Sequence, residues 1–161
     1  MAVGREARDK LLNGQKKTQQ WARKALPILV RQAQARQKIT YSDLAEMLGV
    51  TFRLNLCYVC GCIGSAIQEL SEDKHSGDKL KIPLINALVV NKNTGEPGGG
   101  IGYYIDKYRE SNKAGRTIIM TTLDLYNKIC DYPDWPLVLK EFGLKPYEGS
   151  VIMYRGKNPL N

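Results

Sequence analysis

The chain has 161 residues, of which 43% are hydrophobic, enough to form the core of one domain. No apolar stretch approaches the roughly 20 residues that a membrane-spanning helix needs, and the start, MAVGREARDK, lacks an apolar signal core. We therefore expect a cytoplasmic protein with no membrane partner. Its four cysteines (Cys57, Cys60, Cys62 and Cys130) are expected to be reduced thiols.

The net charge of +8 is concentrated at one end of the chain. Residues 1–38 contain ten basic and two acidic residues, whereas residues 39–161 contain 14 of each. A one-sided basic block favours a polyanionic partner, nucleic acid first. The alternative is a solvated helix whose charge only aids solubility.

Residues 1–14 are expected to be a flexible lead-in that ends at Asn13 and Gly14. Residues 15–37 favour a helix whose apolar positions face inward, and Pro27 is expected to kink it or split it in two. The outward face carries the first group of candidate phosphate contacts: Lys16, Lys17, Arg23, Lys24 and Arg31.

Two further helices are expected to follow a short extended link. The first covers residues 41–48, with Thr40 as a cap and Gly49 as a stop. The second covers residues 55–70 and buries an apolar stripe. Its opposite face is small or polar: Tyr58, Gly61, Cys62, Ser65 and Gln68.

The segment Ile82–Tyr104 combines an apolar run with a Gly-rich loop. Residues 84–90 and 101–105 are predicted to be antiparallel strands, joined by a loop that contains Gly98 and Gly99. Consecutive glycines cost ordering entropy and bury no side chain. The loop therefore predicts a close approach of backbone to a ligand or to another part of the fold.

This order of elements predicts an α+β fold, a winged helix-turn-helix formed by residues 15–105. Helix 55–70 would enter a groove of nucleic acid, and the Gly-rich loop would be the wing. Residues 106–161 would form a helical extension on the same domain, with helices over residues 122–130 and from Asp134 to Phe142. The candidate contacts in this part are Arg53, Tyr58, Ser65, Gln68, Lys92, Asn93, Gly98 and Gly99.

Three short motifs resemble the DNA-binding domain of the O6-alkylguanine-DNA alkyltransferases and the alkyltransferase-like proteins. They are TYSDLAEMLG (residues 40–49), IGSAIQEL (63–70) and IP followed by ALVVNKNTG (82–95). The resemblance covers roughly residues 39–103. It implies a winged helix on duplex DNA, the helix 55–70 in the minor groove, and Tyr41 near a backbone phosphate.

The chain departs from this family where the chemistry would lie. The family's nucleophilic cysteine follows the Ile-Pro pair, and here Leu84 follows Ile82 and Pro83. Without a thiol at this position there is no activated nucleophile for alkyl transfer. Gly61 also stands where the family has its arginine finger. We therefore expect a non-catalytic protein that requires no cofactor.

Other functional sites and activities must also be considered. The spacing C-x2-C-x-C at residues 57–62 invites a zinc site, but zinc needs four ligands and only Cys130 and His75 remain, so we predict no metal site. A metal-dependent nuclease using Glu96, Asp106 or Glu110 is one alternative. A protein-interaction module, or an inhibitor of a DNA-processing enzyme, is the other.

Overall fold

The computed structural model describes residues 6–51, 53–98 and 121–158, apart from the side chain of Arg53. Over these residues the fold is mostly helical, with one small parallel sheet. The elements are α1 (Glu6–Asn13), α2 (Lys17–Gln34), β1 (Ile39–Thr40), α3 (Tyr41–Leu48), α4 (Arg53–Lys74), the 3-10 helix η1 (Ile85–Leu88), β2 (Val89–Val90), α6 (Thr122–Asp131) and α7 (Trp135–Glu141). None of the described helices combines the length and the apolar character that a membrane crossing requires.

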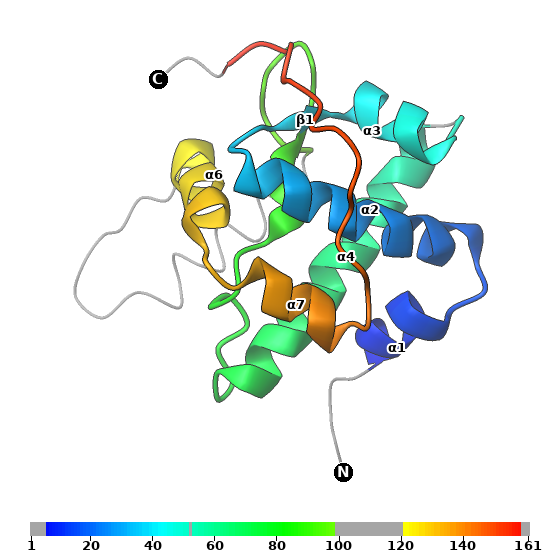
Figure 1. Cartoon of the computed structure of the whole chain (residues 1–161), viewed down its shortest axis with the longest axis vertical. Coiled ribbons are helices and arrows are strands. Elements are labelled where there is room, and N and C mark those ends of the chain that lie inside the picture. The colour runs from blue at the N-terminus through cyan, green and yellow to red at the C-terminus, as the bar shows by residue number, and fades with distance from the viewer. Residues whose placement is uncertain (1–5, 52, 99–120, 159–161) are drawn as a thin grey trace.

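Helices α2 and α4 form the centre of the molecule, and α4 passes behind α2 in Figure 1. Both contribute fully buried side chains to one core, among them Leu26 and Leu29 of α2 and Ile63 and Ile67 of α4. Helix α2 is continuous through Pro27, so the predicted split into two helices does not occur. Pro27 is itself buried, so packing around it offsets the hydrogen bond that it removes.

The predicted ends of helix α3 are confirmed. The Thr40 hydroxyl accepts a hydrogen bond from the N–H of Asp43 at 3.1 Å, which caps α3. Gly49 ends α3 with φ +71°, and the N–H of Val50 donates to the carbonyl of Ala45 at 2.9 Å. These bonds satisfy the groups left free at both ends of a short helix.

The predicted strand over residues 84–90 is largely wrong. Residues 85–88 form η1, and only Val89 and Val90 are extended. They pair in parallel with β1, with Ile39 opposite Val89. The predicted antiparallel partner, residues 101–105, lies outside the described residues. An antiparallel bridge between Val90 and Pro97 shows that the chain reverses after β2.

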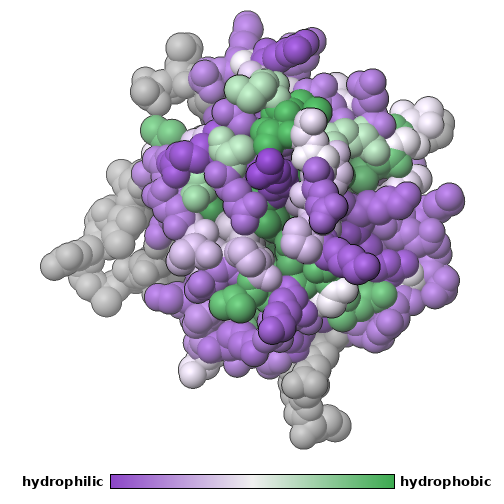
Figure 2. Space-filling view, viewed as in Figure 1, coloured by the Kyte–Doolittle hydropathy of each residue, from purple (hydrophilic) through white to green (hydrophobic). Residues whose placement is uncertain are grey.

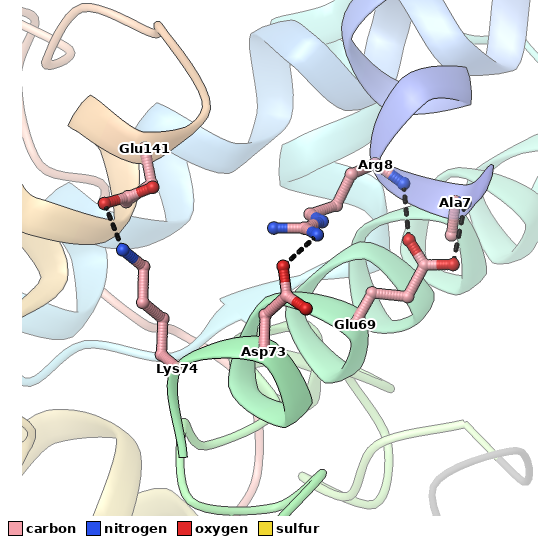
Figure 3. Close-up of polar contacts among 6 residues, drawn as sticks. All are labelled: Ala7, Arg8, Glu69, Asp73, Lys74 and Glu141. Atoms are coloured by element: carbon pink, nitrogen blue, oxygen red, sulfur yellow. Dashed lines mark hydrogen bonds and ion pairs between the residues drawn. The ribbon is translucent and has the colours of Figure 1, made fainter. Parts of the chain in front are cut away.

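The predicted flexible lead-in is also wrong, because residues 6–13 form helix α1 and Leu11 is fully buried. Figure 3 shows how α1 is held on α4. The carboxylate of Glu69 accepts the N–H groups of Ala7 and Arg8 at 2.9 and 2.8 Å, and Arg8 pairs with Asp73. A carboxylate from α4 thus caps the N-terminus of α1, where the helix dipole favours negative charge.

The C-terminal helices pack on the same core, as predicted. Trp135, Val138, Leu139 and Phe142 are each at most 3% exposed. Asp134 occupies the N-cap position of α7, but its side chain makes no capping hydrogen bond. Instead, the Trp135 indole N–H donates to the carbonyl of Ile129 at 2.7 Å and ties α7 to α6. The chain then crosses in front of α2 and rises toward β1 (Figure 1).

Candidate nucleic-acid interface

Several basic residues of the N-terminal segment are engaged within the fold. Lys10 pairs with Glu6 and Arg36 pairs with Asp131. The Arg23 guanidinium donates to the carbonyls of Leu11 and Gly14 at 2.9 and 3.0 Å, so it fixes the link between α1 and α2. Arg23 was predicted to contact phosphate, but the structure gives it this internal role.

Four predicted phosphate contacts remain exposed, and no carboxylate among the described residues forms an ion pair with them: Lys16, Lys17, Lys24 and Arg31. Lys17, Lys24 and Arg31 follow each other at intervals of seven residues. Seven residues are close to two helical turns, so the three cations lie in one line, about 10 Å apart along the axis of α2. We call these three residues the α2 row.

A second exposed surface lies along α4. Tyr58 is 60% exposed, Gly61 is exposed, and Ser65 and Gln68 are half-buried. They belong to the face that was predicted to be open, and Leu54, at 64% exposure, continues it toward the N-terminus of the helix. Arg53 begins this helix, but its side chain lies outside the described residues.

The two surfaces face away from each other. Helices α2 and α4 share a core, and helical periodicity places the α2 row and the open face of α4 opposite the fully buried side chains of their own helices. The contact of helix 55–70 and the basic helix with one nucleic acid stays a prediction.

Charge distinguishes the two surfaces. Residues 41–74, which contain α3 and α4, hold two basic and five acidic residues, a net charge of −3. Residues 1–38 carry the whole excess of +8. Figure 2 views the molecule with α2 in front of α4, and this side is mainly hydrophilic, with hydrophobic residues in small separate groups. The α2 side is therefore the more favourable of the two surfaces for an anion, by charge alone.

The Gly-rich turn lies at the far end of α2 from Lys16 and Lys17. Its Gly95 carbonyl is 3.5 Å from the ammonium of Lys38, a few residues beyond the C-terminus of α2. Lys92 and Asn93 are exposed in this turn. Helix α2 alone is about 27 Å long, because it has 18 residues with a rise of about 1.5 Å each. The Gly-rich turn and the N-terminus of α2 therefore lie at opposite ends of this helix.

Gly98 makes the close backbone approach that the glycines predicted. Its N–H donates to the Tyr41 hydroxyl at 3.1 Å, and a Cβ at this position would lie 2.6 Å from that oxygen. Tyr41 is only 8% exposed. The resemblance placed Tyr41 near a DNA phosphate, whereas here its hydroxyl holds the loop. Gly99, the other predicted contact of this loop, lies outside the described residues.

No thiol or catalytic group stands where the alkyltransferases have their nucleophile. Leu84 is 2% exposed, and η1 follows it directly. The side-chain amide of Asn86 packs against Gly64 of α4, where a Cβ would meet it at 3.1 to 3.3 Å. Its Oδ1 is buried without a hydrogen-bond partner among the described residues. The position that corresponds to the family's nucleophile is therefore filled by packed, buried side chains.

The three clustered cysteines differ in their surroundings. Cys57 is exposed, Cys60 is buried and Cys62 is half-buried. Burial raises the pKa of the Cys60 thiol to about 12. No group of three or more metal-ligating side chains comes together within the described ranges. Glu96 is exposed, and Asp106 and Glu110 of the nuclease alternative lie outside these ranges.

Comparisons of this chain with models of known protein families, with curated proteins and with solved structures find no match.

The sequence did not predict the cluster that forms around Lys38. Lys38 lies over the rings of Tyr126 and Tyr154, 5.2 and 5.7 Å from their centroids, and burial lowers its pKa. Lys38, Tyr126 and Tyr154 are far apart in the chain, and no local residue pattern connects them.

Proposed function

We propose that this protein binds nucleic acid, with duplex DNA as the first candidate, through the α2 row, and that it does so without catalysing a reaction. The observation that carries the proposal is the line of three exposed cations at Lys17, Lys24 and Arg31, none of them paired with a carboxylate of the described chain. Lys16 adds a fourth charge at the start of α2. Such a row suits phosphates, which are contacted by position and not by base sequence.

The fold supports this use of the row. Two carboxylates of α4 are engaged by α1: Glu69 accepts its first N–H groups, and Asp73 pairs with Arg8. The positive field of α2 is therefore not cancelled locally, and it can steer a polyanion toward the surface. Helices α2, α3 and α4 precede the Gly-rich turn in the chain, and this order is compatible with the proposed winged helix. On this proposal the phosphate-binding helix is α2, in place of α4.

Salt-dependent binding tests the proposal. Labelled duplex DNA, single-stranded DNA and duplex RNA are titrated with the full chain by fluorescence anisotropy, over a series of salt concentrations, with and without Mg²⁺. Each lost phosphate contact reduces the slope of log K against log salt by about 0.9. We expect the variant K17A/K24A/R31A to reduce this slope by about 2.7.

The matched control K81A/K140A/K145A removes three exposed lysines elsewhere on the chain. It should keep the wild-type slope. Equal slopes for the two triple variants, or no binding of any nucleic acid at low salt, contradict the proposal. Cleavage of the probe in the presence of Mg²⁺ would favour the nuclease alternative.

A protein partner on α4 is the second candidate function. Leu54 and Tyr58 are 64% and 60% exposed and lie one turn apart on the same face. A paired leucine and aromatic residue on an acidic surface suits a protein contact better than a phosphate contact. The variant L54S/Y58S should abolish co-purification of such a partner, whereas K17A/K24A/R31A should retain it. The opposite pattern contradicts this candidate.

A further inference from the structure

The C-terminal segment is attached to the far end of α2 by specific hydrogen bonds. The side-chain amide of Gln32 pairs with both backbone groups of Ile152, at 2.8 Å each. The Oε1 of Gln37 accepts the N–H of Tyr154 at 3.0 Å. Beyond Tyr154, the N–H of Lys157 donates to the carbonyl of Lys92 at 3.0 Å. Residues 152–157, here named the tail, therefore join α2 to the Gly-rich turn.

Within the tail, residues 154–157 form a locked turn. The Tyr154 hydroxyl donates to the carbonyl of Lys157, and its ring lies beside the ammonium of Lys38. The Tyr154 ring also occupies the space that the Cβ atom of any other residue at position 156 would need. A Cβ there would lie 2.5 to 2.7 Å from three ring and hydroxyl atoms, so Gly156 permits the turn.

This turn presents two cations to solvent. Arg155 and Lys157 are exposed and alternate with the half-buried Tyr154 and Gly156. Neither of the two pairs with a carboxylate among the described residues. The backbone bond from Lys157 sets them beside Lys92, which is also exposed. Glu96 is the acidic residue of the Gly-rich turn. Its single negative charge is smaller than the three positive charges of Lys92, Arg155 and Lys157.

We propose that the tail is a second phosphate-binding element, in which Arg155 and Lys157 together with Lys92 continue the track of the α2 row along the backbone of a bound nucleic acid. The inference rests on the proposed function. It adds a specific extension: the bound polymer follows α2 toward its C-terminus and ends on the turn at residues 154–157. Because the turn is held before binding, little conformational entropy is lost when the phosphates arrive.

The test uses the full chain and the salt-titrated duplex DNA assay. The variant R155A/K157A should reduce the slope of log K against log salt by about 1.8, that is about 0.9 for each lost contact. The control K81A/K140A removes the same charge elsewhere and should leave the slope unchanged. The charge-conserving variant R155K/K157R should bind like the wild type.

Gly156→Ala tests the geometry without changing any charge. The new methyl group displaces the Tyr154 ring, so we expect weaker DNA binding although both cations are present. Far-UV circular dichroism verifies that each variant is folded.

The outcomes separate the two proposals. If the wild type binds and R155A/K157A matches K81A/K140A, the tail inference is overturned and the proposed function stands. Wild-type affinity for Gly156→Ala overturns the role of the locked turn. If the wild type binds no nucleic acid, both proposals fall together.

Discussion

The side chain of Gln32 forms two hydrogen bonds with the backbone of Ile152, although 120 residues separate them in the chain. Its Nε2 donates to the Ile152 carbonyl and its Oε1 accepts the Ile152 N–H, each at 2.8 Å. Gln32 is 1% exposed, so neither bond is replaced easily by water. A polar residue in the last turn of an amphipathic helix thereby fixes the path of the last part of the chain.

Gln32→Ala should destabilise the protein and release the tail. The substitution leaves the partly buried N–H and carbonyl of Ile152 without these partners, and an unpaired buried group costs about 1 to 3 kcal/mol. We expect the free energy of unfolding to fall by about 3 kcal/mol in urea titrations. Limited proteolysis should cut the tail faster. The control Gln34→Ala lies on the exposed side of the same helix and should change stability by less than about 0.5 kcal/mol.

Glu69→Ala should loosen α1 without unfolding the core. The Glu69 carboxylate accepts two N–H groups at the start of α1, and loss of a helix cap costs about 0.5 to 2 kcal/mol. Amide hydrogen exchange should accelerate over residues 6–13. Glu72→Ala is the matched control, because it lies on the same helix and its ion pair with Lys79 is long, at 3.9 Å. Equal exchange rates in both variants would show that Glu69 does not hold α1.

Local signals predicted local structure well. Thr40 and Gly49 mark the ends of α3, and Thr122–Asp131 is helical within one residue of the predicted end. The glycine at position 98 indicated a close backbone approach, which the structure shows with Tyr41. In each case the deciding groups lie within a few residues or follow from backbone sterics.

The wrong predictions concern segments whose structure is determined by residues far away in the chain. Residues 6–13 are helical because Glu69 and Asp73 of α4 hold them. The apolar run at residues 85–88 suits a strand by composition, yet packing between α2 and α4 favours a 3-10 turn. Periodicity gives the exposed side of each helix, but only tertiary packing shows that α2 and α4 share one core.

The buried Cys60 thiol predicts a loss of stability at high pH. Burial raises its pKa in the folded protein to about 12, from 9.0 in the unfolded chain. The folded state therefore holds the proton more tightly, and its stabilising effect is complete below pH 9 and is lost as the pH rises toward 12. The slope is at most about 1.4 kcal/mol per pH unit.

The measurement is the free energy of unfolding of the wild type and of Cys60→Ala between pH 8 and pH 11. Other groups titrate in both proteins, so their contribution cancels in the difference. We expect the advantage of the wild type over Cys60→Ala to shrink as the pH rises. A difference that stays constant between pH 8 and pH 11 would contradict the prediction.

Gly61 and Gly64 of α4 should respond differently to alanine. A Cβ at Gly61 meets no atom within 4 Å, whereas one at Gly64 lies 3.1 to 3.3 Å from the amide of Asn86. Alanine is favoured over glycine in a helix by about 1 kcal/mol. Gly61→Ala should therefore raise the free energy of unfolding by about this amount. Gly64→Ala must also move Asn86, so we expect it to be at least about 1 kcal/mol less stable than Gly61→Ala. Urea titrations of the two variants give this difference directly, and equal stabilities would mean that the contact between Gly64 and Asn86 is looser than the structure shows.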